Sequence, residues 1–164
     1  MIGFHAKTRR AEKHQVIACD LTTNEVGDTT AVPGLLGQIR AGFKQLLGDG
    51  AYDGQPTYDA VLAVQSDAEI IIPPRENALC SDGGQSQRDA HIQFIQGNGR
   101  LAWQQETNYG LRSYVELAMQ RFKRIFGNTL KARKLPQQLT EARIASSALN
   151  IMTSLGMPVS VKCI

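Results

Sequence analysis

The sequence is poor in cysteine, in histidine and in long apolar runs, and each shortage excludes a class of protein. Its three cysteines, Cys19, Cys80 and Cys163, are odd in number and widely spaced, which argues against a disulfide framework and against a zinc site. The three histidines have no ligand partners at metal spacing, so we interpret them as surface or structural residues. The most apolar stretch, residues 69–74, ends in two prolines and is far shorter than a membrane span. These shortages favour a soluble cytoplasmic protein without a membrane partner.

Acidic residues are scarce in the C-terminal part of the chain, although the whole chain has a net charge of only +3. Residues 1–99 hold 8 Lys and Arg against 12 Asp and Glu, whereas residues 100–164 hold 10 against 3. Residues 121–134, RFKRIFGNTLKARK, carry six positive charges and no acid. A basic half favours a polyanionic partner, most simply a nucleic acid. The alternative is that lysine and arginine only solvate the outer faces of helices.

The predicted elements alternate between strands and helices and then continue as helices only. Strands are predicted at residues 15–21, directly before the glycine-rich turn of residues 48–54, and at residues 69–74. Helices are predicted over residues 29–42, 55–67, 87–106 with a break near 97–100, 108–127 and 140–155. We expect Asp28 or Thr29 to cap the first helix, with Pro33 in its first turn. The alternation indicates an α/β domain whose sheet is parallel at least in part.

Residues 108–123, NYGLRSYVELAMQRFK, set four polar side chains in line beside an apolar helix face. Tyr109, Arg112, Glu116 and Lys123 fall within about 60° of a helical wheel at roughly 100° per residue. The adjoining arc is apolar and consists of Leu111, Val115, Ala118, Met119, Phe122, Ile125 and Phe126. The guanidinium and the amine of this line suit contact with phosphates, and the phenol suits stacking or hydrogen bonding on the same strand.

Asp49 stands at the end of a predicted strand, between Gly48 and Gly50. Ligands collect at the carboxyl ends of strands in open α/β sheets, and we expect the two glycines to let a bulky group approach the carboxylate. Together with Glu116, Asp49 provides the hard oxygen donors that Mg²⁺ prefers. Such a pair of carboxylates suits metal-dependent chemistry on phosphodiesters.

Both acids also have an ordinary structural explanation. Arg112 and Glu116 are four residues apart, and such pairs on solvated helix faces contribute only about 0.2–0.5 kcal/mol. Asp49 could simply hold an Asx turn. Spacing alone therefore leaves the catalytic and the structural interpretation open.

The same four polar residues match the Y-(2)-R-(3)-E-(6)-K signature of bacterial insertion-sequence transposases of the DDE class. Four stretches also resemble landmarks of that family in the expected order: LTTNEVGDTTAVPGLL, LLGDGAYDG, IIIPPRENA and QRFKRIFGNTLKAR. The resemblance covers the chain from about residue 15. It implies a partial ribonuclease-H-like catalytic core over residues 15–156, between a basic N-terminal segment (residues 1–15) and a C-terminal tail (residues 157–164).

By this resemblance, three acidic residues would bind Mg²⁺ or Mn²⁺, cleave DNA at a transposon end and use the freed 3′-hydroxyl to attack target DNA. Asp49 resembles the second acid and Glu116 the third, which makes both catalytic and metal-binding candidates. Tyr109, Arg112 and Lys123 are the corresponding DNA-binding candidates. The expected partners are transposon-end and target DNA, a second copy of the chain or a full-length transposase, at the bacterial nucleoid.

The sequence departs from the family at the first catalytic acid. In the family this Asp precedes the VIACDLTTNEVGD landmark, but residues 1–15 contain no Asp. Asp20 lies inside the landmark, where the family tolerates other polar residues. We therefore expect a truncated core that lacks its first one or two strands, has impaired catalysis and associates through an exposed sheet edge. Two alternatives are a non-catalytic DNA-binding remnant that associates with full-length transposase, and a ribonuclease-H-like nuclease unrelated to transposition.

Overall fold

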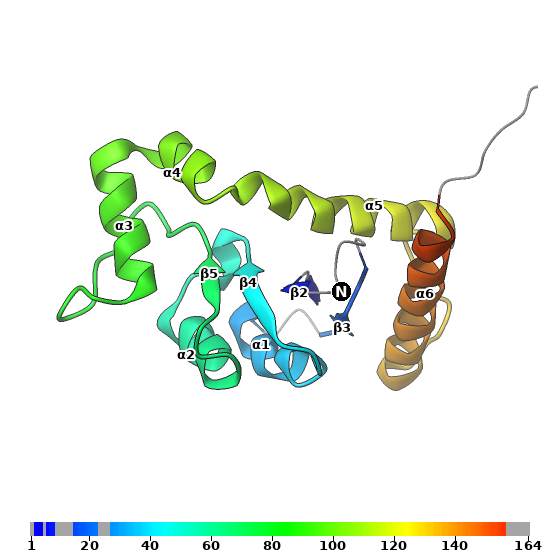
Figure 1. The fold of residues 1–164 in the computed structure, drawn as a ribbon. Helices are drawn as coiled ribbons and strands as arrows, with labels where there is room; N and C mark the ends of the chain where they lie inside the picture. The colour runs from blue at the N-terminus through cyan, green and yellow to red at the C-terminus, as the bar shows by residue number, and fades with distance from the viewer. Residues whose placement is uncertain (1, 5, 9–14, 23–26, 157–164) are drawn as a thin grey trace, which may run out of the picture.

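The computed structural model describes residues 2–4, 6–8, 15–22 and 27–156 (Figure 1). The strands of this part are β1 (Ile2–Phe4), β2 (Ala6–Thr8), β3 (Ala18–Asp20), β4 (Phe43–Leu47) and β5 (Glu69–Ile71). β1 pairs antiparallel with β3, and β4 lies between antiparallel β2 and parallel β5. The α/β class and the partly parallel sheet are therefore confirmed. The predicted tail, residues 157–164, and most of the basic segment, residues 1–15, lie outside the described residues.

The helices cover the sheet and extend beyond it at both ends. They are α1 (Asp28–Leu36), η1 (Gly50–Tyr52), α2 (Gln55–Val64), α3 (Gln87–Asn98), α4 (Arg100–Glu106), η2 (Tyr109–Arg112), α5 (Ser113–Phe126) and α6 (Leu135–Leu155), where η denotes a 3₁₀ helix. α3 and α4 form one end of the molecule, and the long α5 runs from there to α6 at the other end (Figure 1). None of the helices in the described ranges is long and apolar enough to cross a membrane.

The β4–β5 pair is buried on both of its faces. Leu46 and Ile70 are fully buried in a core that α1 and α2 complete. Their neighbours Leu47 and Ile71 point to the opposite face, because successive strand residues alternate, and pack there with Trp103 of α4. Burial on both faces explains why consecutive residues are apolar at the ends of both strands, Leu46 with Leu47 and Ile70 with Ile71, and it fixes the end of β4 where the candidate site begins.

The start of α1 differs from the prediction. Gly27 is its N-cap, without a side-chain hydrogen bond, and neither Asp28 nor Thr29 takes that position. Pro33 lies inside the helix and not in its first turn. The helix tolerates this proline because the ring is exposed and the helix already ends at Leu36, so only one interior hydrogen bond is lost.

Two further helix starts were placed incorrectly from the sequence. α6 begins at Leu135, five residues before the predicted Thr140, because Pro136 in the first turn is compatible with a helix start. The predicted helix of residues 108–127 is divided. Asn108 has a left-handed backbone with φ of 51°, Tyr109–Arg112 forms a 3₁₀ turn, and regular helix follows only from there.

Two side chains of α3 cover the outer edge of β5. The Gln87 amide accepts from the backbone N–H of Ile70 at 2.9 Å and donates to the carbonyl of Ala68 at 3.0 Å. His91 Nε2 lies 2.8 Å from the carbonyl of Ile70, and its Nδ1 accepts from the indole N–H of Trp103 at 3.0 Å, so Nε2 is the donor nitrogen. The strand edge thus has no free backbone groups at these residues. His91 is a structural residue, as predicted.

Candidate active site

Asp49 lies at the carboxyl end of β4, separated from the strand only by Gly48, as predicted. It is the N-cap of the short η1 helix, and its Oδ1 accepts from the backbone N–H of Ala51 at 2.9 Å. This is the turn-holding role that we considered as the ordinary alternative. The hydrogen bond from Ala51 uses only Oδ1 of Asp49, so Oδ2 is available for a different partner.

The two glycines beside Asp49 serve close packing and not ligand access. A Cβ at Gly48 would lie 3.1 Å from a side-chain carbon of Ile72, and one at Gly50 would lie 3.4 Å from the carbonyl of Pro73. The expectation that they leave room for a bulky group is therefore wrong. Their lack of side chains lets the segment after β5 pack against the turn that carries Asp49.

Arg112 joins the two candidate acids. Its NH2 group donates to Asp49 Oδ2 at 3.2 Å, and its NH1 group donates to Glu116 Oε1 at 2.7 Å. Asp49 and Glu116 come from a strand end and a helix 67 residues apart, yet their carboxylates meet at one guanidinium. The side chains of the three residues are 41%, 30% and 62% exposed in the order Asp49, Arg112, Glu116. Solvent ions and phosphates can therefore reach the group, and the ion pairs add little to folding stability.

Tyr109 fixes the 3₁₀ turn that carries Arg112 to the end of β4. Its hydroxyl donates to the carbonyl of Gly48 at 3.2 Å, one residue before Asp49. Its ring packs against Trp103 with centroids 5.2 Å apart, in the small core of Leu47 and Ile71. Burial raises the pKa of the Tyr109 phenol, so the group stays a hydrogen-bond donor at neutral pH.

Lys123 is exposed and lies seven residues beyond Glu116 on α5. At 1.5 Å per residue this separation is roughly 10 Å along the helix axis. The structure therefore brings Asp49, Tyr109, Arg112 and Glu116 together at the end of β4, and places Lys123 further along the same helix.

The described residues gather two acids at this place and not three. Among them no group of three or more His, Cys, Asp and Glu side chains is arranged to hold a metal ion. Asp20 at the end of β3 accepts from the backbone N–H of Leu21 at 2.8 Å. Its Oδ2 would lie 3.8 Å from a Cβ on Gly34, so its carboxylate faces α1. Asp20 does not supply a third ligand in the described part of the chain.

Two buried acids were missed from the sequence, and both are structural. Asp53, four residues after Asp49, forms a bidentate pair with Arg88 of α3 at 2.7 and 3.0 Å. Asp89 forms a capping box with Ser86 and also accepts from Ser81. The hydrogen bond from the Ser81 hydroxyl has the largest effect, followed by that from Ser86, and together they hold the pKa of Asp89 well below its usual range. The Ser86-to-Asp89 spacing was a readable signal for the helix start. The pairing of Asp53 with Arg88 had no local signal.

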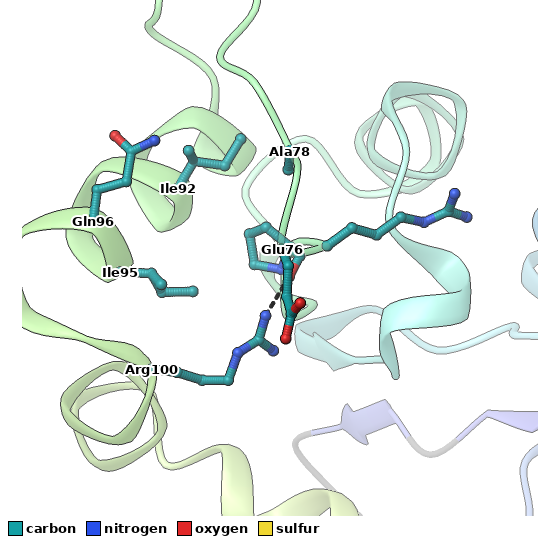
Figure 2. Close-up of a pocket in the computed structure, with 8 residues that line it drawn as sticks. Glu76, Ala78, Ile92, Ile95, Gln96 and Arg100 are labelled. Atoms are coloured by element: carbon teal, nitrogen blue, oxygen red, sulfur yellow. Dashed lines mark hydrogen bonds between the residues drawn. The ribbon is translucent and has the colours of Figure 1, made fainter.

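A separate pocket of about 190 Å³ lies between the segment after β5 and helices α3 and α4 (Figure 2). Ile92 and Ile95 form its apolar side, and Arg100 crosses its mouth to donate to the carbonyl of Pro74 at 2.7 Å. Its lining contains neither Asp49 nor Glu116. This pocket is thus distinct from the candidate site, whose side chains are open to solvent at the end of β4.

A profile of the family described as "Transposase DDE domain" matches residues 8–151. The chain belongs to this family. No solved structure matches it. The matched range of the DDE domain includes all five residues proposed from the sequence, and the family resemblance is confirmed. The family role is that of a transposase acting on DNA, and DDE transposases generally use divalent metal ions.

Proposed function

We propose that this DDE domain takes part in DNA transposition, with Asp49 and Glu116 as the acids that hold a divalent metal ion for strand cleavage and transfer. The observation that carries the proposal is the meeting of both carboxylates at the guanidinium of Arg112. Two acids from a strand end and a rigid helix, both reachable from solvent, form a surface site for a phosphodiester. The Asx turn explains Asp49 Oδ1 but gives no reason for Oδ2 to share a guanidinium with Glu116.

The donor set fits Mg²⁺ or Mn²⁺. These ions prefer oxygen ligands and bind through one or two carboxylates while substrate phosphates and water fill the other positions. Asp49 and Glu116 supply such a pair. A bound ion would polarise the scissile phosphate and lower the pKa of an attacking water or hydroxyl.

Arg112 and Lys123 are the proposed contacts to the DNA backbone. A guanidinium binds a phosphate through two parallel N–H groups, and a carboxylate pair alone would repel the polyanion. Arg112 now pairs with both acids and neutralises one of their two charges, so we infer that it turns to a phosphate when a cation takes its place. Tyr109 holds the turn of Arg112 against the end of β4, beside the same DNA strand.

We infer that catalysis by these residues alone is weak. Two carboxylates meet in the described part of the chain, and a two-ion mechanism needs a shared ligand that neither of them provides. The same observation supports a second candidate function, in which the chain binds DNA without cleaving it and acts through assembly with another transposase chain. The two functions differ in whether any cleavage depends on Asp49.

A nicking assay on supercoiled plasmid separates the two functions. With Mg²⁺ or Mn²⁺ we expect slow nicking by the wild-type chain that Asp49→Asn and Glu116→Gln each abolish, while DNA binding by both variants persists. The reason is that each amide keeps the shape of the side chain but removes the charge that holds the cation. Asp59→Asn on α2, an exposed carboxylate away from the site, is the matched control. Rapid nicking that Asp49→Asn leaves unchanged would disprove the proposed catalytic pair; no nicking by any form would support the DNA-binding alternative.

A further inference from the structure

We propose that the α5–α6 loop, residues 127–134, is a rigid contact for the DNA phosphate backbone and that Glu141 is the residue that positions it. The inference rests on the proposed function, because it takes DNA as the partner. It adds a second contact region, outside the group of Asp49, Arg112 and Glu116, and a positioning role for an acid inside a basic surface.

Glu141 of α6 holds the backbone of the loop. Its carboxylate accepts from the N–H of Lys131 at 2.9 and 3.0 Å and from the N–H of Ala132 at 2.9 Å. The side-chain amide of Gln138 donates to the carbonyl of Ala132 at 3.0 Å. The backbone N–H and the carbonyl of Ala132 are therefore both held by side chains of α6. These backbone hydrogen bonds lower the pKa of Glu141, in agreement with a carboxylate that is fixed in its charged form. A loop held in this way does not have to be ordered on binding.

The side chains of the held loop are cationic and face solvent. Lys131, Arg133 and Lys134 are exposed, as are Lys123 and Arg124 in the last turn of α5. Among the ion pairs of the described residues, none involves any of these five cations. Arg121, the sixth cation of the segment, is used differently and donates to the hydroxyl of Thr153, which docks α5 on α6. Five unpaired cations on one short segment form a surface for a polyanion.

The position of the loop suits a duplex that extends from the candidate site. α5 leads from Glu116 near its first turn to Phe126 at its end, ten residues and roughly 15 Å further along. Figure 1 shows α5 as a nearly straight helix that runs from α4 to α6. With a rise of about 3.4 Å per base pair, the loop would meet phosphates about four or five base pairs from the scissile one.

A change at Glu141 separates two possible contributions to DNA binding: the fixed geometry of the loop and the net charge of the surface. If charge alone mattered, a carboxylate beside the cationic loop would oppose DNA binding, and its removal would strengthen binding. If the loop must be held in place, removal of Glu141 weakens binding although the net positive charge rises, because the freed loop has to be ordered on the DNA. The two explanations therefore predict opposite changes in DNA affinity when Glu141 is removed.

The test measures the affinity of a fluorescent duplex for the full chain as a function of salt. We expect Lys131→Gln with Arg133→Gln and Lys134→Gln to reduce the slope of log affinity against log salt by about 2 to 3, at about 0.9 per phosphate contact. Glu141→Ala should weaken binding roughly 3- to 10-fold, and hydrogen exchange at the Lys131 and Ala132 amides should become faster. Arg40→Gln is the matched control for the cations, because Arg40 is exposed and precedes the opposite, amino end of β4. Asp59→Asn is the control for the loss of one negative charge.

Each outcome decides a different question. Wild-type binding with an unchanged slope in the triple variant would overturn the loop contact and leave the proposed function intact. Tighter binding by Glu141→Ala would overturn the positioning role. The triple variant changes only exposed side chains, so its result decides the question of the loop even if Glu141→Ala unfolds. No DNA binding by the wild-type chain at low salt would contradict both this inference and the proposed function.

Discussion

Replacement of Arg88 with alanine is expected to lower the free energy of unfolding by about 3–5 kcal/mol, because it leaves a buried carboxylate without its partner. The Asp53 side chain is 1% exposed, and Arg88 binds both of its oxygens. Asp53 also accepts from the backbone N–H of Arg75 at 3.1 Å, and Arg88 donates to the carbonyl of Leu79 at 3.1 Å. The pair therefore ties the turn after β4, the segment after β5 and helix α3 together.

Urea denaturation measures this loss directly. The double variant Asp53→Asn with Arg88→Met should recover part of the stability, because it removes the isolated charge as well as the pair. Arg40→Ala, which changes an exposed arginine, is expected to change stability by less than about 0.5 kcal/mol. A loss below about 1 kcal/mol for Arg88→Ala would show that the turn does not depend on this pair.

Replacement of Arg112 with glutamine is expected to raise the affinity for Mn²⁺ about tenfold and to lower the affinity for DNA. In the folded chain one positive charge lies 2.7 Å from Glu116 and 3.2 Å from Asp49, so an incoming cation has to displace it. Two contacts of this kind near the surface are worth about 1.4 kcal/mol together, which corresponds to a factor of about ten. The DNA affinity falls because a phosphate contact is lost.

Titration with Mn²⁺, followed by the electron paramagnetic resonance of the free ion, gives the first affinity, and fluorescence anisotropy gives the second. Lys123→Gln is the matched control, because Lys123 carries the same charge on α5, the helix that follows Arg112, but lies away from the two acids. It should weaken DNA binding without raising the Mn²⁺ affinity. Equal Mn²⁺ affinities for Arg112→Gln and wild type would show that Arg112 does not compete with the cation.

Three of the five described strands, β3, β4 and β5, and the candidate acids could be predicted from the sequence because their signals are local. β1 and β2, which pair with β3 and β4, were not predicted. The apolar pair Leu46 and Leu47 is followed at once by a glycine-rich turn, so both the end of β4 and the exposed position of Asp49 could be inferred. Arg112 and Glu116 are one helical turn apart, and their contact follows from that spacing. The ordered landmarks identified the family, which the match over residues 8–151 confirms.

Features that depend on distant residues could not be predicted. Asp53 and Asp49 stand in the same glycine-rich turn, and only the fold shows that Asp53 is paired with an arginine 35 positions away while Asp49 faces solvent. The binding of the β5 edge by Gln87 and His91 also joins residues that no short pattern connects. The 3₁₀ turn at Tyr109 was not predicted, because a helical wheel assumes one regular α-helix; the hydrogen bond that anchors this turn reaches Gly48, 61 residues earlier.

The central claim is that Asp49 and Glu116 together hold one divalent cation, and Mn²⁺ binding to the two single carboxamide variants and their combination tests it most directly. The account predicts one saturable Mn²⁺ site in the wild-type chain, with an affinity that Asp49→Asn and Glu116→Gln each reduce about tenfold or more. Each single variant should keep one weakened site and the combined variant should lose saturable binding, because both carboxylates hold the same ion, and Asp59→Asn should bind as the wild type does. Unchanged Mn²⁺ binding after Asp49→Asn or after Glu116→Gln, or two saturable sites of which each change removes a different one, would contradict the claim.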